Sequence, residues 1–186
     1  MPTYRHKDTG KRFLFIHIPR TAGRFIQENI RLNGYEAEQD IWQTIDGVEI
    51  SHLHRELYQK YLDVENIEHI AIIRDPVDRY ISLKSYKCYP KGWFRPQVDY
   101  ITSITHLWNF EDGFGEDFGF WMSEKLQIDF RIDSFAQYPM NRHEGLNQLD
   151  RTPKLIDNVR KLWSRDIEQL YPQLAAPLQE GEEAKT

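Results

Sequence analysis

The sequence of 186 residues has a single cysteine, Cys88, and no long run of apolar residues. One cysteine can form no disulfide within the chain, and it excludes a cysteine-based zinc site. No stretch approaches the about 18 apolar residues of a membrane-spanning helix, and the first residues lack the apolar run of a secretory signal. These absences predict a cytoplasmic protein that does not associate with a membrane.

Excess positive charge is also missing. Lys and Arg number 24 against 29 Asp and Glu, which gives a formal net charge of -5. A general nucleic-acid binder needs a basic surface, so nucleic acid is not expected as a partner. An anionic ligand would need a local basic site within a mildly acidic protein. The Walker A pattern G-x-x-x-x-G-K-[ST] is absent too, which argues against an ordinary P-loop ATPase or kinase.

The chain does contain short apolar runs that alternate with amphipathic stretches. Residues 13–18 and 68–74 are nearly continuous apolar runs, which are typical of buried strands. Helices are predicted over residues 24–33, 54–62, 76–88, 98–108, 117–126, 152–163 and 164–170. The alternation predicts an α/β fold with a central parallel sheet flanked by helices. We expect one domain over residues 1–175 and a disordered acidic tail over 176–186.

The segment after the first predicted strand has the composition of an anion-binding loop. A helix begins there, and its free N–H groups and dipole favour a bound phosphate. Ala22 and Gly23 are small enough to let an anion approach the backbone. Thr21 adds a hydroxyl donor, and Arg20 and Arg24 add positive charge on either side. The alternative interpretation is a plain strand–helix turn with two surface arginines.

A second candidate segment follows the second predicted strand. Asp75 is placed as the N-cap of a helix, with Pro76 at its first position. Arg74 leaves the strand end and can grip a phosphate bidentately. Ser82 can donate to the same group if its face of the helix is turned towards the first loop. The alternative is that Asp75 only caps the helix, while Arg74 or Arg79 pairs with a carboxylate.

Together, the two segments resemble motifs of the sulfotransferases that use 3′-phosphoadenosine 5′-phosphosulfate (PAPS). The likeness is to the carbohydrate "family 2" branch, which includes heparan sulfate 2-O-sulfotransferase. There the first loop reads H-I-P-K-T-A-G-T-S, and residues 17–24 here read H-I-P-R-T-A-G-R. The second motif reads V-R-D-P-x-x-R-x-x-S, which residues 73–82 match without a gap. Weaker likenesses join residues 95–100 to a P-Q-x-x-Y element, 138–142 to a P-x-N turn and 165–171 to a closing helix.

The resemblance implies a P-loop-NTPase-like sulfotransferase fold and transfer of the sulfuryl group of PAPS to a hydroxyl of a carbohydrate or another small acceptor. It implies that residues 20–24 hold the 5′-phosphosulfate. Arg74 and Ser82 would bind the 3′-phosphate, the group that distinguishes PAPS from ATP.

Arg20 replaces the lysine of the family motif. Arginine can neutralise the leaving phosphate but does not readily give up a proton. A protein that binds PAPS or another nucleotide without turnover is therefore the main alternative. A kinase-like phosphotransferase is a third possibility, but the missing Walker A lysine and the pairing of Arg74 with Ser82 count against it.

Sulfuryl transfer needs no metal, and by analogy with phosphoryl transfer it depends on alignment and charge stabilisation. The acceptor hydroxyl needs a base, which in the related enzymes is a histidine of a G-H or H-G-H element. His52 matches that position, and His54 is the second candidate. The alternative is that both only flank the helix that begins near His54. His17 is expected to be a satisfied core group. The sequence predicts no metal site and no particular oligomeric state.

Overall fold

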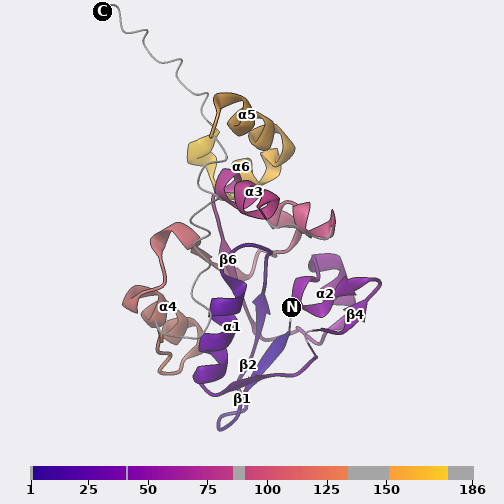
Figure 1. Ribbon diagram of the computed structural model, residues 1–186. Helices are drawn as coiled ribbons and strands as arrows, with labels where there is room; N and C mark the ends of the chain where they lie inside the picture. The colour runs from indigo at the N-terminus through magenta and orange to yellow at the C-terminus, as the bar shows by residue number, and fades with distance from the viewer. Residues whose placement is uncertain (1, 41, 86–90, 134–150, 176–186) are drawn as a thin grey trace, which may run out of the picture.

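The computed structural model describes residues 2–40, 42–85, 91–133 and 151–175. In these ranges a five-stranded sheet has the order β3-β1-β2-β6-β7; Figure 1 labels its strands β1, β2 and β6. Strands β2, β6 and β7 run parallel, while β1 is antiparallel to both β2 and β3. The strands are β1 (Thr3–His6), β2 (Arg12–Ile16), β3 (Tyr35–Ala37), β6 (Glu68–Ile73) and β7 (Thr105–Asn109), with β4 (Thr44–Ile45) and β5 (Val48–Glu49) forming a separate hairpin.

The helices agree with most of the predicted ones. The α-helices are α1 (Gly23–Leu32), α2 (Arg55–Tyr61), α3 (Pro76–Lys84), α4 (Glu116–Leu126), α5 (Pro153–Leu162) and α6 (Ser164–Leu170). Short 3-10 turns are η1 (Ile50–His52), η2 (Lys91–Phe94), η3 (Gln97–Asp99), η4 (Phe110–Asp112) and η5 (Pro172–Leu174). Residues 86–88, expected at the end of α3, and the expected tail 176–186 lie outside the described residues. No described helix is long and apolar enough to cross a membrane.

The α/β class with flanking helices is confirmed, but the sheet is mixed: the expected parallel pairing holds for β2, β6 and β7 and not for β1 and β3. β1 and β2 form an antiparallel hairpin, in which Thr3 pairs with Leu14 and Gly10 takes the turn with φ +69°. β3 adds a second antiparallel edge beside β1. Both added strands are too short to leave a clear alternation of apolar and polar residues, so the sequence pattern does not predict them.

The predicted helix over residues 98–108 is also wrong. Residues 105–109 form β7, which pairs with β6 so that Ile73 lies opposite Asn109. Most side chains of β7 are only half-buried, so neither the period of a helix nor that of a strand stands out. Thr105 and Trp108 belong to residue types that favour strands.

Alternate side chains of β2 enter two different cores. Phe13 and Phe15 pack on one face of the sheet against residues of α1 and α4. Leu14 and Ile16 pack on the other face against η1 and α2. This alternation follows from the strand period of two residues, and it places the helices on both faces of the sheet (Figure 1).

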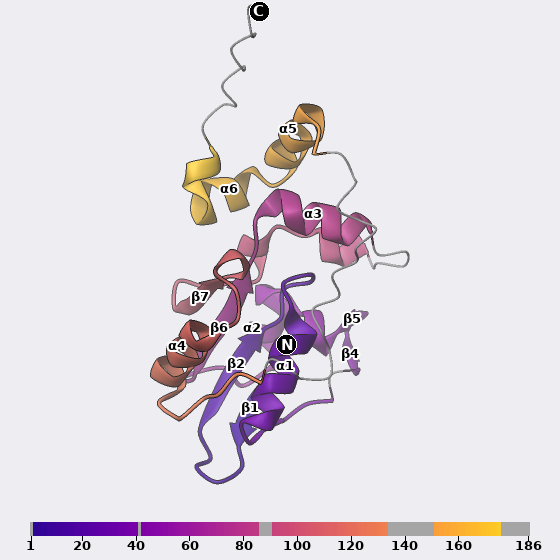
Figure 2. The same ribbon diagram turned by 60° about the vertical axis from the view of Figure 1, so that its left-hand side comes forward.

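A third apolar cluster lies beyond the carboxyl ends of the strands. There α3 packs against α5 and against Trp163, which joins α5 to α6; the buried residues are Val77, Leu83, Val159 and Trp163. Figure 2 shows α3 between the sheet and the α5–α6 pair. The cluster sets the position of α3, and with it one wall of the candidate site.

Candidate anion-binding site

The loop between β2 and α1 is a tight turn built on internal hydrogen bonds. Thr21 is fully buried, and its Oγ1 donates to the Ile18 carbonyl at 2.8 Å. Arg20 and Ala22 have φ values of +70° and +64°, a left-handed conformation that few residues other than glycine adopt. Thr21 was expected as a donor to a ligand; its hydroxyl instead closes the turn. The N–H groups of the first turn of α1, from Gly23 onwards, have no acceptor within the helix by geometry.

Gly23 is the one residue in the loop that the packing restricts to glycine. A Cβ atom at this position would overlap the imidazole ring of His17. His17 is buried, as expected of a core residue, but its Nδ1 has no hydrogen-bond partner within the part of the chain that the structure describes. Burial lowers its pKa well below the usual value, and the nearby charges of His52, Arg24 and Arg20 lower it further. The neutral ring of His17 therefore forms the floor of the loop.

The two motif segments meet at the carboxyl ends of β2 and β6. The Nε of Arg20 donates to Ser82 Oγ at 2.9 Å, and Nη1 of Arg74 donates to the Arg20 carbonyl at 3.3 Å. The face of α3 that carries Ser82 is thus turned towards the loop, as the sequence hypothesis required. Arg24 is exposed on the first turn of α1. Arg20 thus contacts both Ser82, through its side chain, and Arg74, through its carbonyl.

Arg74 keeps much of its donor capacity. Its guanidinium lies over the Phe110 ring at 4.3 Å, and its buried Nε has no hydrogen-bond partner among the residues that the structure describes. Burial lowers its pKa, whereas the charges of Asp78, Glu111 and Asp75 raise it. Within the described residues, Arg74 forms no ion pair with a carboxylate. The alternative, in which Arg74 pairs with a carboxylate, is therefore not found among these residues.

Asp75 and Glu111 close the site on the side of β7. Asp75 caps α3 by accepting the N–H of Asp78 at 2.9 Å, as predicted. Glu111 accepts the Asp75 N–H at 2.7 Å, and Tyr171 Oη lies 3.5 Å from its other oxygen. Burial raises the pKa of Glu111. No sequence pattern singled out Glu111, because its contacts join residues that are far apart along the chain.

Arg79 is a structural residue that sequence reasoning assigned differently. It is fully buried and donates to the carbonyls of Pro19 at 3.1 Å, Arg95 at 3.0 Å and Trp93 at 2.8 Å. Its guanidinium stacks on Trp163 at 4.6 Å. Burial lowers its pKa to about 10, so it stays charged at neutral pH. Arg79 pairs with carbonyls rather than with a carboxylate, and it ties the start of the loop to α3.

His52 lies beside the floor of the loop. Its ring is 4.6 Å from that of His17 and 4.7 Å from that of Trp93. His52 Nδ1 lies 3.3 Å from the His17 carbonyl oxygen. A carbonyl can only accept, so Nδ1 carries the proton and Nε2 keeps its lone pair. Burial lowers the pKa of His52 to about 4, which leaves the ring neutral at pH 7.

His54 occupies a different environment. It is the N-cap residue of α2, and its Nδ1 lies 4.0 Å from Glu56. Burial lowers its pKa, and the charge of Arg95 lowers it further. These neighbours belong to α2 and the 95–99 segment. The geometry therefore favours His52 over His54 as the group nearest to the loop, and His54 flanks its helix as the alternative interpretation held.

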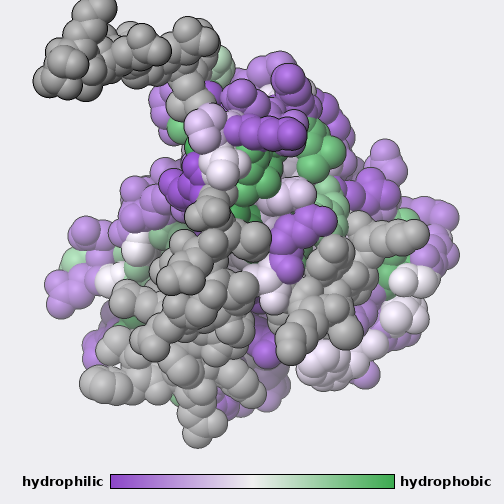
Figure 3. Space-filling model, turned by 45° about the horizontal axis from the view of Figure 1, so that its top comes forward, coloured by the Kyte–Doolittle hydropathy of each residue, from purple (hydrophilic) through white to green (hydrophobic). Residues whose placement is uncertain are grey.

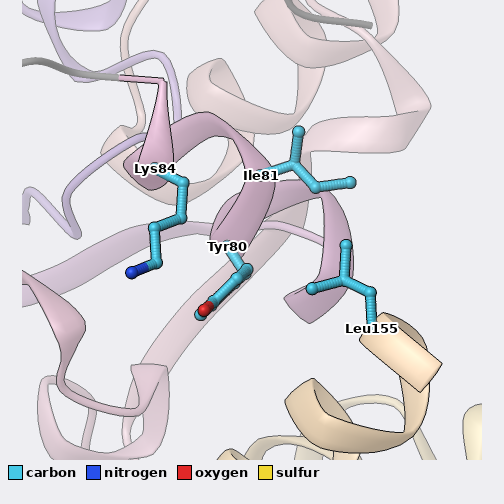
Figure 4. A pocket seen from close by; sticks show the side chains of 4 residues that line it. All are labelled: Tyr80, Ile81, Lys84 and Leu155. Carbon is cyan, nitrogen blue, oxygen red and sulfur yellow. The ribbon is translucent and has the colours of Figure 1, made fainter. Parts of the chain in front are cut away.

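A separate hollow of about 360 Å³ lies between α3 and α5. Figure 4 shows Tyr80, Ile81 and Lys84 of α3 and Leu155 of α5 around it. Ser82 lies on roughly the opposite face of α3 by helical period, so this hollow opens away from the loop. Figure 3 shows apolar surface among strongly hydrophilic surface at this helical end of the molecule.

Within residues 2–40, 42–85, 91–133 and 151–175, no group of three or more His, Cys, Asp or Glu side chains could hold a metal ion. The P-x-N element at 138–142 lies outside the described residues.

Comparisons of the chain with family models, with curated proteins and with solved structures found no match.

Proposed function

We propose that the protein is a PAPS-dependent sulfotransferase with a P-loop-NTPase-like fold, acting on a hydroxyl of a carbohydrate or another small acceptor. The observation that carries the proposal is the contact between the two motif segments. Arg20 reaches Ser82, and Arg74 reaches the Arg20 carbonyl, across the ends of two parallel strands. Ligands of α/β proteins bind at this edge of the sheet.

The residues present fit a ligand with phosphate groups at two separate positions. The N–H groups at the start of α1 and the small residues of the loop suit the 5′-phosphosulfate. Arg74 has an Nε without a partner among the described residues, and it contacts the carbonyl of Arg20, whose side chain reaches Ser82; this arrangement suits the 3′-phosphate. The Phe110 ring lies 4.3 Å from the Arg74 guanidinium and, unlike a carboxylate, takes up none of its N–H donors.

The chemistry follows from these placements. Attack by the acceptor oxygen on sulfur breaks the bond between sulfur and the phosphate oxygen, and PAP (3′-phosphoadenosine 5′-phosphate) leaves. Arg20 and the N–H groups of α1 stabilise the charge that develops on the leaving phosphate. His52 accepts the hydroxyl proton on Nε2, the atom that keeps its lone pair in the tautomer set by the His17 carbonyl.

A second candidate function is binding without turnover. The Nε of Arg20 is engaged with Ser82 on α3, so this side chain is drawn towards the wall of the site. The guanidinium also cannot supply a proton as the family lysine can. A PAPS-binding protein that performs no transfer would need only the anion contacts.

The first test compares PAP with ADP, which lacks the 3′-phosphate. PAP at about 100 times its dissociation constant should stabilise the fold by about 2.7 kcal/mol and raise the Tm by about 5–10 °C. ADP at the same concentration should raise it less, and Arg74→Ala should remove the difference. A wild-type protein that responds equally to both ligands would contradict both candidate functions.

Release of PAP from PAPS in the presence of a panel of sugars and small alcohols then separates the two candidates. Release that depends on an acceptor supports the transferase. PAP binding without release under any condition supports the binding protein.

A further inference from the structure

Gln97 makes a paired contact with the backbone of Arg74. The Arg74 N–H donates to Gln97 Oε1 at 2.9 Å, and Gln97 Nε2 donates to the Arg74 carbonyl at 2.8 Å. The Gln97 side chain is fully buried. An amide that offers an acceptor and a donor together reproduces what a neighbouring strand offers to a peptide group. Gln97 therefore holds the chain in place one residue beyond the end of β6.

Asp166 of α6 holds Gln97 in turn. Its two carboxylate oxygens accept the N–H of Gln97 at 2.8 Å and the N–H of Val98 at 3.0 Å. Asp166 is fully buried, so its charge is stabilised mainly by these two donors and by the nearby charge of Arg79. Burial raises the pKa of Asp166, while the hydrogen bonds lower it. The contacts form a continuous path from α6 through η3 to Arg74.

We infer that Gln97 is a positioning residue that fixes the point from which the Arg74 guanidinium reaches a 3′-phosphate, and that Asp166 keeps Gln97 in place. The inference rests on the proposed function, since it assigns Arg74 to that phosphate. Among the described residues, two side-chain contacts otherwise orient Arg74: the Nη1 bond to Arg20 and the contact with the Phe110 ring. A backbone shift of about 1 Å would misalign the N–H donors of the Arg74 guanidinium and remove a large part of its affinity for the phosphate.

A positioning role and a purely structural role have different consequences. If the Gln97 amide only stabilised the fold, its loss would weaken the binding of all ligands to the same extent. Gln97 as a positioning residue acts through Arg74, so its loss should weaken ligands that carry a 3′-phosphate and spare those that lack one. The ratio of the PAP and ADP dissociation constants is therefore the decisive quantity.

The experiment measures both dissociation constants by titration calorimetry for the wild type, Gln97→Glu and Gln97→Met. Gln97→Glu keeps the shape and the acceptor, but it places a second acceptor opposite the Arg74 carbonyl. Gln97→Met fills the volume without polar atoms. Both variants should weaken PAP binding by about tenfold and change ADP binding by less than about twofold. Asp166→Asn should move the ratio in the same direction.

Tyr58→Phe is the matched control. Tyr58 is also fully buried and also donates to a backbone carbonyl, that of Tyr100, at 2.9 Å. This control should lower stability and leave the ratio of PAP to ADP affinity unchanged. Folded Gln97 variants whose ratio equals that of the wild type would overturn the inference while the proposed function stands. A wild type with no preference for PAP over ADP would overturn both.

A measurement on the wild type covers the case in which the Gln97 variants do not fold. The side-chain amide resonances of Gln97 should shift in NMR spectra on addition of PAP and stay in place with ADP. Equal responses to PAP and ADP in a protein that prefers PAP would overturn the positioning role.

Discussion

His17 and Gly23 restrict each other at the base of the loop. The buried ring of His17 occupies the volume that any side chain at position 23 would need. His17 also supplies the carbonyl that sets the tautomer of His52. A change at Gly23 therefore reaches both the loop and the candidate base through one buried ring.

Gly23→Ala should displace the loop or the His17 ring. We expect a loss of stability of about 1–3 kcal/mol, the range for overpacked sites, together with weaker PAP binding. Urea denaturation and PAP titration measure the two effects. Gly92→Ala is the control, because a Cβ atom there would meet no atom of the described residues within 4 Å. Equal stability of the two variants would show that the His17 ring can move aside with little loss in the free energy of unfolding.

His52 gives the protein a specific dependence of stability on pH. Its pKa is about 4 in the folded protein against about 6.5 in an unfolded chain. Between these values the unfolded chain binds more protons, so stability falls as the pH drops from about 6.5 to 4. The contribution of this group is at most about 3 kcal/mol, and burial of His17 acts in the same direction.

His52→Gln should flatten part of this slope, as measured by urea denaturation at pH 4.5, 5.5 and 7. His6→Gln serves as the control histidine variant.

His52→Ala should leave PAP binding intact and reduce turnover by about 100-fold, which is a typical contribution of general-base catalysis. Turnover equal to that of the wild type would show that His52 is not the base.

At the scale of elements, α3 is connected to the loop through Arg79. This one side chain joins α3 to the carbonyls of Pro19, Trp93 and Arg95. The loop and the η2 segment are thus held to the same helix. The placement of Ser82 opposite Arg20 depends on that connection.

Arg79→Met should leave three carbonyls without their donor. We expect a loss of about 3–5 kcal/mol, as for other broken networks around buried charges, seen as a lower midpoint in chemical denaturation. Arg31→Met is the control, since the Arg31 side chain is exposed and its ion pair with Glu28 should contribute far less to stability. Comparable losses for the two variants would contradict the anchoring role.

The elements that the sequence predicts are those with strong local signals. β2 and β6 are continuous apolar runs, and α3 begins with a cap and a proline that the structure retains. β1, β3 and β7 are short or half-buried, so tertiary pairing defines them more than local pattern does.

The same division holds for the site. Arg20, Arg74 and Ser82 stand at motif positions, and the structure brings them together. Gln97 and Asp166 lie in the two weaker likenesses, residues 95–100 and 165–171, but those likenesses gave neither residue a role, because both act on backbone atoms of distant residues. The motifs therefore predicted the roles of the groups that face a ligand, but not the roles of the residues that hold them.

At the scale of the whole molecule, the C-terminal helices are part of the site's support. Trp163, between α5 and α6, is almost fully buried, stacks on Arg79 and donates from Nε1 to the Phe94 carbonyl at 2.9 Å. Asp166 in α6 reaches Gln97. Trp163 thus supports Arg79, and Asp166 supports Arg74 through Gln97. Both supporting residues lie far from the second motif in the sequence.

Trp163→Ala should therefore weaken the fold and the site together. The cavity should cost about 3–5 kcal/mol, and PAP should bind more weakly because Arg79 and α3 lose their support. Denaturation followed by circular dichroism measures the stability of the fold. The protection that added PAP gives against denaturation measures PAP binding. Leu162→Ala, at an exposed neighbouring position, should change neither by a comparable amount. A Trp163→Ala protein that is destabilised but binds PAP with unchanged affinity would show that the C-terminal helices stabilise the fold without positioning the site.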